Sequence, residues 1–305
     1  MNGPRDPQRA QEIQVCHLGL VPYRDGIAIQ ERLRERRIAD EIPDTLLLLE
    51  HPPTFTRGRR AAAEELPFGD SFYRDRGAEV HATDRGGRVT YHGPGQLIGY
   101  PIMSVTDVHG HLRTMEEAII EALSQAGVEA RSRHAEGIDY TGVWVSAPGT
   151  PRGNTQVGNP AGARKIASLG VHIQRGISTH GFAVNVENDL TPFSWVIACG
   201  LPDVTMTSLA LETQGAGTPQ GGVPNGGRPG EGLACFRRRM AYAFCSAHGR
   251  RQRLVTPARL GIAPPGPSGS APHRRPGAHG RAARRPAPPA AHSVAGHAAS
   301  RGAGR

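Results

Sequence analysis

The sequence predicts an α+β fold, with a mixed, largely antiparallel sheet and packed helices. Short apolar segments of strand length recur along the first 250 residues, and turns rich in Gly and Pro separate them as in β-hairpins. Only a few segments carry the apolar stripe of a helix, so the regular helical crossovers that a parallel sheet requires are not expected. No internal repeat divides the chain.

The first elements alternate strand, helix and strand. Residues 12–20 are largely apolar, and apolar and polar side chains alternate along them, which favours a strand. Residues 25–39 carry a partial apolar stripe, which favours a helix. Four leucines follow Thr45 without interruption, as in a strand that is buried on both faces. The two prolines at 52–53 should end that strand.

Glycines divide the segment 79–103 into strands. The pair at 86–87 indicates a tight turn between two strands, and the Gly-Pro-Gly sequence at 93–95 indicates a second break. Paired glycines also let a backbone approach a ligand closely. An ordinary glycine-rich hairpin would explain the same residues without any ligand.

The clearest helix covers residues 115–126. Thr114 and Glu117 have the spacing of a capping box at its start, and Gly127 suits its end. The elements expected after it are strands at 141–145, 165–173 and 178–186 and an amphipathic helix at 233–248.

Charge and composition divide the chain at residue 250. Residues 251–305 contain ten arginines, no Asp or Glu and few large apolar side chains, so they should not bury enough surface to fold. Because the whole chain has a formal charge of +9 and this segment contributes +10, residues 1–250 carry about −1. We expect a folded domain at 1–250 and a disordered tail at 251–305, with no specific nucleic-acid binding.

The four cysteines lie far apart and form no C-x-x-C pair; they are Cys16, Cys199, Cys235 and Cys245. A structural zinc site and a disulfide framework are therefore not expected. The polar N-terminus lacks the apolar core of a signal peptide, and no apolar run is long enough to cross a membrane. These features predict a soluble cytoplasmic protein with no membrane association and no metal.

Lys165 is the only lysine in the 305-residue chain, which uses arginine at every other basic position. Lysine, unlike arginine, can release its proton near neutral pH. Further along the chain, Cys199 lies between Ala and Gly at the end of an apolar run. A nearby cation favours the thiolate, so the pair suggests a cysteine nucleophile activated by a lysine. A small buried thiol and a codon bias against lysine are the simpler interpretations.

Several segments together resemble the lipoyl(octanoyl) transferase family over about residues 12–248. In chain order they are DTLLLLEHPPTFTRGRR, DRGGRVTYHGPGQLIGYPI, TGVWV, RKIASLGVHI, STHGFAVNV and DLTPFSWVIACGL. The glycine-rich block is shared with a wider group, whereas its combination with KIASLG and the later PFSWVIACG is specific. Members of this family move an octanoyl chain from acyl carrier protein to a lysine of lipoate-dependent proteins.

The resemblance implies an acyltransferase domain with a fold similar to the catalytic domains of lipoate and biotin protein ligases. It implies that Cys199 is the acyl-thioester nucleophile and that Lys165 is the lysine that favours its thiolate. The residues that match the segments lining the acyl site are Arg85, Gly86, Gly87, Arg88, Val89, Thr90, Tyr91, His92, Ser168, Leu169, Gly170, Gly181, Phe182 and Ala183.

The implied donor is octanoyl-acyl carrier protein. The implied acceptors are the lipoyl domains of 2-oxoacid dehydrogenases and the glycine cleavage H protein. No ATP and no other cofactor is expected, because a thioester is already activated. Backbone N–H groups near the glycines should stabilise the oxyanion.

Four side chains, three of them among the matching residues, are weaker candidates for a direct role. His92 and His180 could hold substrate or water, although a histidine beside glycines is also a common structural hydrogen-bonding group. Arg85 and Arg88 could meet the carrier's phosphopantetheine or its acidic face, although solvated arginines are the simpler expectation.

The chain departs from the family pattern in three places: a longer loop at 147–163, an expanded loop at 214–230 and the tail after 250. None of the three removes a motif residue. Three other functions stay open at this point. They are an ATP-dependent lipoate or biotin ligase, which needs no nucleophilic cysteine, a thioesterase, and a non-catalytic acyl-carrier-binding or scaffold protein.

Overall fold

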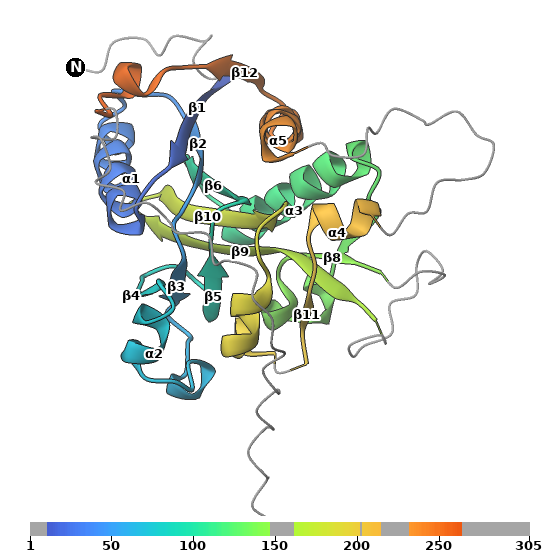
Figure 1. Ribbon diagram of the computed structural model, residues 1–305. Helices are drawn as coiled ribbons and strands as arrows, with labels where there is room; N and C mark the ends of the chain where they lie inside the picture. The colour runs from blue at the N-terminus through green and yellow to red at the C-terminus, as the bar shows by residue number, and fades with distance from the viewer. Residues whose placement is uncertain (1–10, 147–161, 202, 215–231, 264–305) are drawn as a thin grey trace, which may run out of the picture. The chain divides into compact units, whose positions relative to one another are not determined.

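A mixed β-sheet runs through the centre of the domain (Figure 1). The structure is a computed structural model that describes residues 11–146, 162–201, 203–214 and 232–263. Within these residues the sheet has nine strands, in the order β12-β1-β2-β6-β10-β9-β8-β7, with β11 paired to β9. Their bounds are β1 (Glu12–Leu20), β2 (Thr45–Glu50), β6 (Gln96–Ile102), β7 (Ala130–Ser132), β8 (Val143–Val145), β9 (Arg164–Gln174), β10 (Ile177–Asn185), β11 (Thr205–Met206) and β12 (Arg251–Leu254).

Most neighbouring strands of this sheet are antiparallel. Among the described residues, β1 lies parallel to both β2 and β12, and β11 lies parallel to β9. The mixed, largely antiparallel sheet predicted from the sequence is therefore confirmed. Among its antiparallel pairs, β9 and β10 are joined by a tight turn, which an antiparallel pair permits, whereas β2 with β6 and β6 with β10 pair segments that are distant in sequence.

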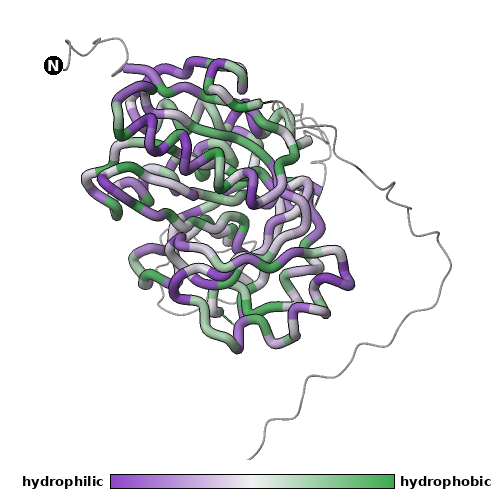
Figure 2. The backbone as a smooth tube through the Cα atoms, turned by 90° about the vertical axis from the view of Figure 1, so that its left-hand side faces the viewer, coloured by the Kyte–Doolittle hydropathy of each residue, from purple (hydrophilic) through white to green (hydrophobic). Residues whose placement is uncertain are grey.

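Helices cover both faces of the sheet. The helices that supply side chains to its two cores are α1 (Tyr23–Ile38), α3 (Val108–Gln125), α4 (Leu209–Gln214) and α5 (Leu233–Ala247), whereas α2 (Asp70–Arg74) packs against the smaller sheet described below. Figure 2, which views the domain from the α1 side of Figure 1, shows hydrophilic colour along much of α1. None of the described helices is both long and apolar enough to span a membrane.

The four leucines of β2 show why the sheet lies at the centre. Leu46 and Leu48 join a hydrophobic core that includes side chains of α3 and α5, whereas Leu47 and Leu49 join a second core that includes side chains of α1. Successive side chains of a strand point to opposite faces, so an unbroken leucine run fills both cores. The strand buried on both faces is confirmed.

A smaller sheet consists of β3 (Thr54–Arg57), β4 (Glu79–Ala82) and β5 (Val89–His92). β3 lies between the others, parallel to β4 and antiparallel to β5. The glycine pair at 86–87 therefore does not join two paired strands, and the hairpin interpretation is wrong. The connection from β3 to β4 includes α2 and is long enough for a parallel crossover, which the glycines themselves cannot reveal.

β9 and β10 form the hairpin against which the site is built. Arg175 and Gly176 make its turn, both with positive φ. The register places Gly170 opposite Gly181 and Leu169 opposite Phe182. The two strands predicted on either side of this turn are confirmed.

Helix α3 begins earlier than predicted. It starts at Val108, and the Thr114 hydroxyl donates a hydrogen bond to the Gly110 carbonyl one turn earlier, at 3.0 Å. Thr114 and Glu117 therefore lie inside the helix, and the predicted capping box is wrong. His109 and Gly110 have low helix propensity, so the periodicity of apolar residues did not reveal the first two turns.

The folded domain continues past residue 250. β12 extends the sheet beside β1, and Leu260 and Ile262 are 1% and 6% exposed in the core that α1 joins. The predicted boundary at residue 250 is therefore wrong. The composition was averaged over all of residues 251–305, so the few apolar residues near the start of this segment did not stand out. Residues 264–305 and nearly all of the two long loops, 147–161 and 215–231, lie outside the described residues.

Candidate active site

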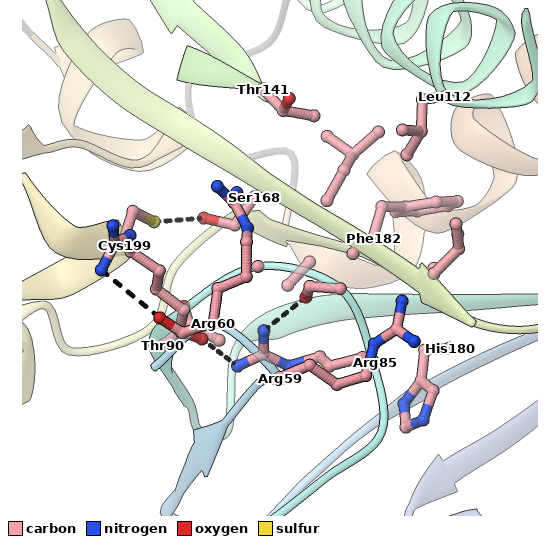
Figure 3. A pocket seen from close by; sticks show the side chains of 18 of the residues that line it. Arg59, Arg60, Arg85, Thr90, Leu112, Thr141, Ser168, His180, Phe182 and Cys199 are labelled. Carbon is pink, nitrogen blue, oxygen red and sulfur yellow. Dashed lines mark hydrogen bonds between the residues drawn. The ribbon is translucent and has the colours of Figure 1, made fainter. Parts of the chain in front are cut away.

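A cavity of about 360 Å³ lies against the β9–β10 hairpin. Its other walls come from the connection between β4 and β5, the start of α3 and the residues before β8. Figure 3 shows Cys199 and Ser168 toward one side of this cavity and Leu112 and Phe182 toward the other. This volume lies within the usual range for small-molecule sites.

Cys199 enters the cavity from a short turn, Ala198–Gly200. Its backbone is left-handed, with φ 59° and ψ 15°, and Gly200 follows with φ 69°. A left-handed conformation is costly for a residue with a side chain, by roughly 1–3 kcal/mol, and such residues cluster at functional sites. The half-buried thiol is thus held in a strained turn that points it into the cavity.

Lys165 supplies a cation beside this thiol. Its side chain is 1% exposed, and its Nζ donates to the Cys199 Sγ at 3.3 Å. Its backbone is fixed between two neighbouring strands, opposite Trp144 of β8 and Met206 of β11. This contact places a hydrogen-bond donor directly at the sulfur.

A β-bulge brings Ser168 to the same thiol. Ser168 Oγ lies 3.8 Å from Cys199 Sγ, yet residues three apart on a regular strand point to opposite faces. Between Lys165 and Ala167 the pairing with β8 skips one residue, Ile166, and both Ile166 and Ala167 lie in the same core. The extra residue turns Ser168 back to the side of Lys165.

Arg85 is a structural residue of the cavity wall. Its guanidinium donates to the carbonyl oxygens of Thr56 and Arg88, each at 2.7 Å, and to the Thr56 hydroxyl. It is 8% exposed. The expectation of a solvated arginine is wrong here, because these bonds tie the glycine-rich connection to β3.

Arg88 packs against the turn that carries Cys199. It donates to Glu65 Oε1 at 2.6 Å, and Glu65 also accepts from the Val89 and Ile197 amides through its carboxylate and its carbonyl. A Cβ at Gly200 would collide with the Arg88 side chain. The glycine after the cysteine is therefore required by close approach as well as by its positive φ.

Apolar side chains line the part of the cavity away from the arginines (Figure 3). They come from β6, α3, β9 and β10 and are Ile98, Leu112, Leu169, Val171, Phe182 and Ala183. The Phe182 ring packs on Gly99, where no side chain would fit. This surface can bury an aliphatic chain whose reactive end lies at Cys199.

The two candidate histidines are neutral and have structural partners. Burial lowers the pKa of His92 to about 3, and its Nδ1 donates to Gln96 Oε1 at 2.9 Å. Burial also lowers the pKa of His180, whose Nε2 lies 2.7 Å from Asp84 Oδ1. The hydrogen bond from His180 lowers the Asp84 pKa to about 2. Within the described residues, no hydrogen bond joins either imidazole to Cys199 or Lys165.

Two backbone amides among the expected oxyanion donors already have partners. Gly86 N donates to Val171 O at 2.9 Å, and Gly200 N donates to Ile197 O at 3.3 Å. In this conformation, the N–H groups of Gly86 and Gly200 therefore point to these carbonyl oxygens and not to the Cys199 thiol.

The cavity gathers every predicted site residue except Tyr91. Tyr91 is buried in a third core, beside Phe55 and Phe193. The sequence analysis did not single out several other residues that line the cavity: Tyr23, Arg59, Arg60, Ile98, Tyr100, Val108, His109, Leu112, Ile138, Asp139, Thr141 and Val171. Six of these residues lie in quoted motifs and could have been found there, namely Arg59, Arg60, Ile98, Tyr100, Thr141 and Val171. The residues of α1 and α3 carried no signal beyond helix formation.

Among the described residues, no cluster of three or more His, Cys, Asp or Glu side chains could hold a metal ion.

Comparison with known families finds a match over most of the described residues. Residues 22–220 match the model of the lipoyl protein ligase A/B catalytic domain. The match begins just before α1 and includes Lys165 and Cys199.

Curated relatives at about 40–45% identity are named octanoyltransferase. That of Acidothermus cellulolyticus is 44% identical over 199 residues, which cover 64% of this chain and 80% of the relative. That of Rubrobacter xylanophilus is 45% identical, with the same coverage. A mitochondrial octanoyltransferase of Arabidopsis thaliana is 40% identical over 66% of this chain and 79% of its own.

Solved structures with this fold include lipoate protein ligases. A putative lipoate protein ligase of Thermoplasma acidophilum superposes with a TM-score of 0.52 at 18% identity, covering 80% of this chain and 88% of its own. A lipoate-protein ligase A bound with ATP gives 0.55 at 17% identity, covering 80% and 89%. These likenesses confirm the predicted lipoate ligase fold.

Proposed function

The chain belongs to the lipoyl protein ligase A/B catalytic domain family, and we propose that it is an octanoyltransferase acting through a thioester on Cys199. It transfers an octanoyl group to a protein lysine in lipoylation. The observation that carries the catalytic assignment is the 3.3 Å contact between Lys165 Nζ and Cys199 Sγ, beside an apolar cavity wall.

In the first half-reaction, the Cys199 thiolate attacks the carbonyl carbon of the octanoyl thioester. A new C–S bond forms to the enzyme, and the C–S bond to the carrier breaks. Lys165, as the ammonium, stabilises the thiolate and then gives its proton to the departing carrier thiol. The octanoyl chain lies along the apolar wall that contains Leu112 and Phe182.

In the second half-reaction, the amine of the acceptor lysine attacks the acyl-enzyme. A C–N bond forms, the C–S bond to Cys199 breaks, and the thiolate is restored. Lys165, now a neutral amine, accepts the proton that the attacking nitrogen loses. Lys165 has therefore given one proton to the carrier thiol and regained one from the acceptor amine, so no ATP and no cofactor enters the balance.

The proposed donor is octanoyl-acyl carrier protein. The proposed acceptors are the lipoyl domains of 2-oxoacid dehydrogenases and the glycine cleavage H protein. The cytoplasmic location expected from the sequence belongs to the same proposal.

An ATP-dependent ligase is the alternative on this fold, since one superposed structure is a lipoate-protein ligase A bound with ATP. The Lys165–Cys199 contact favours the transferase, because adenylate chemistry needs no thiolate. Intact-protein mass spectrometry after incubation with octanoyl-acyl carrier protein separates the two. Without ATP, the transferase gains one octanoyl group, and Cys199→Ala gains none. An unchanged mass, together with transfer of free octanoate only when ATP is present, would establish the ligase.

A further inference from the structure

Glu116 is a buried acid that the mechanism does not use. It lies on α3, is 2% exposed, and its Oε1 accepts the Gly142 N–H at 2.8 Å. Its Oε2 accepts the Ser132 hydroxyl at 2.5 Å. The carboxylate thus joins the two ends of the segment between β7 and β8, of which several residues line the cavity.

Gly142 lies directly against the Lys165 side chain. Its φ is 139°, and a Cβ at this position would be 2.6 Å from Lys165 Cε and 2.5 Å from the Ala167 carbonyl oxygen. Only glycine permits so close an approach. The Gly142 backbone is therefore one wall of the channel in which the lysine side chain lies.

Packing, and not a counter-ion, sets the position of the ammonium. In the part of the chain that the structure describes, Lys165 Nζ makes one hydrogen bond, to Cys199 Sγ, and no ion pair. Its other close neighbours are Gly142 and the Trp144 ring, whose centroid is 5.2 Å away. A four-carbon side chain has many rotamers, so a displaced wall would release the ammonium from the thiol.

We propose that Glu116 is a positioning residue, which holds Lys165 beside Cys199 by fixing the Gly142 backbone. It touches neither the thiol nor the ammonium in any described contact, so it acts through Gly142. The inference rests on the role of Lys165 under the proposed function, but it concerns the reactivity of the thiol and needs no octanoyl substrate to be tested.

The test measures the alkylation rate of Cys199 by iodoacetamide as a function of pH, read at the Cys199 peptide by mass spectrometry. Glu116→Ala should lower the rate at pH 7 by roughly three- to tenfold and move the profile to higher pH, because less thiolate is present. Glu116→Gln should stay near the parent, since its amide oxygen can still accept from Gly142.

The matched control is Glu117→Ala, one residue further on the exposed side of the same helix, which should leave the profile unchanged. If Glu116→Ala fails to fold, Glu116→Asp takes its place. It keeps the charge but withdraws the carboxylate by one methylene, and it should shift the profile in the same direction.

A double variant decides whether the effect passes through the lysine. In a Lys165→Met background, Glu116→Ala should cause no further loss of alkylation rate. An equal loss with and without the lysine would overturn the proposal, as would a parent-like profile for folded Glu116→Ala. If Lys165→Met alone leaves the profile unchanged, the positioning role and the proposed role of the lysine both fall, whereas octanoyl transfer is judged separately by the mass experiment.

Discussion

Trp144 lies opposite Lys165 across the β8–β9 pair, with Lys165 Nζ 5.2 Å from the centroid of its ring. An aromatic face attracts a cation without competing for its protons. A carboxylate in the same place would bind the ammonium and withdraw it from the thiol. The aromatic wall therefore leaves Cys199 as the hydrogen-bonding partner of Lys165 among the described residues.

Replacement of Cys199 tests the proposed acyl-enzyme directly. Cys199→Ala should lower octanoyl transfer by at least about 10³-fold and abolish the covalent intermediate, with the thermal unfolding midpoint little changed. Cys235→Ala, at a half-buried thiol on α5, is the control and should transfer at the parent rate. Normal transfer by Cys199→Ala would exclude a cysteine thioester.

Replacement of the lysine should separate the two half-reactions. Lys165→Arg keeps a cation near the thiol, so acylation should fall only by about tenfold. Arginine cannot accept the proton of the incoming amine, so transfer should fall by about 10² or more and the acyl-enzyme should accumulate. Single-turnover measurements of each step check this, and near-normal rates in both would show that the proton exchange is not needed.

Gly200, which follows Cys199, can be compared with Gly249, a second glycine of positive φ. Gly200 and Gly249 both have positive φ, 69° and 64°, but only a Cβ at Gly200 would meet another side chain, that of Arg88. Gly249→Ala should cost about 1 kcal/mol of unfolding free energy. Gly200→Ala should cost more, about 2–4 kcal/mol, and should also slow acylation. Equal effects on stability and activity would contradict the close packing of Arg88 on this turn.

Acid stability should depend on His111. Burial lowers its pKa to about 4, so between about pH 6.5 and pH 4 the unfolded chain binds a proton that the folded chain does not. Folding stability should therefore fall as the pH is lowered through this window, by up to about 3 kcal/mol from this residue. Denaturant unfolding at pH 7 and pH 4.5 should show a smaller loss for His111→Leu than for the parent.

Two truncations test the extended domain boundary. Removal of residues 264–305 should leave the unfolding free energy unchanged. Removal of 251–305 also takes away β12 and the buried Leu260 and Ile262, and should cost about 3–5 kcal/mol. If the two truncated chains had equal unfolding free energies, the folded domain would end at residue 250, as the sequence predicted.

Local pattern was enough for most elements and for the choice of reactive groups. The leucine run of β2 and the two strands of the β9–β10 hairpin are determined by periodicity over a few residues. Lys165 and Cys199 stood out because lysine is otherwise absent and a small-residue turn encloses the thiol. The contact between these two side chains depends on the fold. It was expected only because the sequence resembles a family in which such a pair occurs.

Long-range pairing was beyond a reading of the sequence. Whether β4 and β5 pair with each other or on either side of β3 depends on contacts between distant segments, and the glycines between them suit both arrangements. Arg85 and Arg88 looked like surface groups because arginine usually is one. Their partners, Thr56 and Glu65, lie more than twenty residues away in sequence.

The bulge at Ile166 makes the chemistry of this site depend on counting as well as on residue type. Lys165 and Ser168 are three residues apart, so a regular strand without the bulge would turn the serine to the face opposite the lysine, although Lys165, Ser168 and Cys199 would all remain in the sequence. A distant homologue could therefore match every motif letter and still lack the site. The spacing between the motif's lysine and serine therefore has to be judged together with the bulge, because the identity of the two residues does not decide whether both side chains reach the thiol.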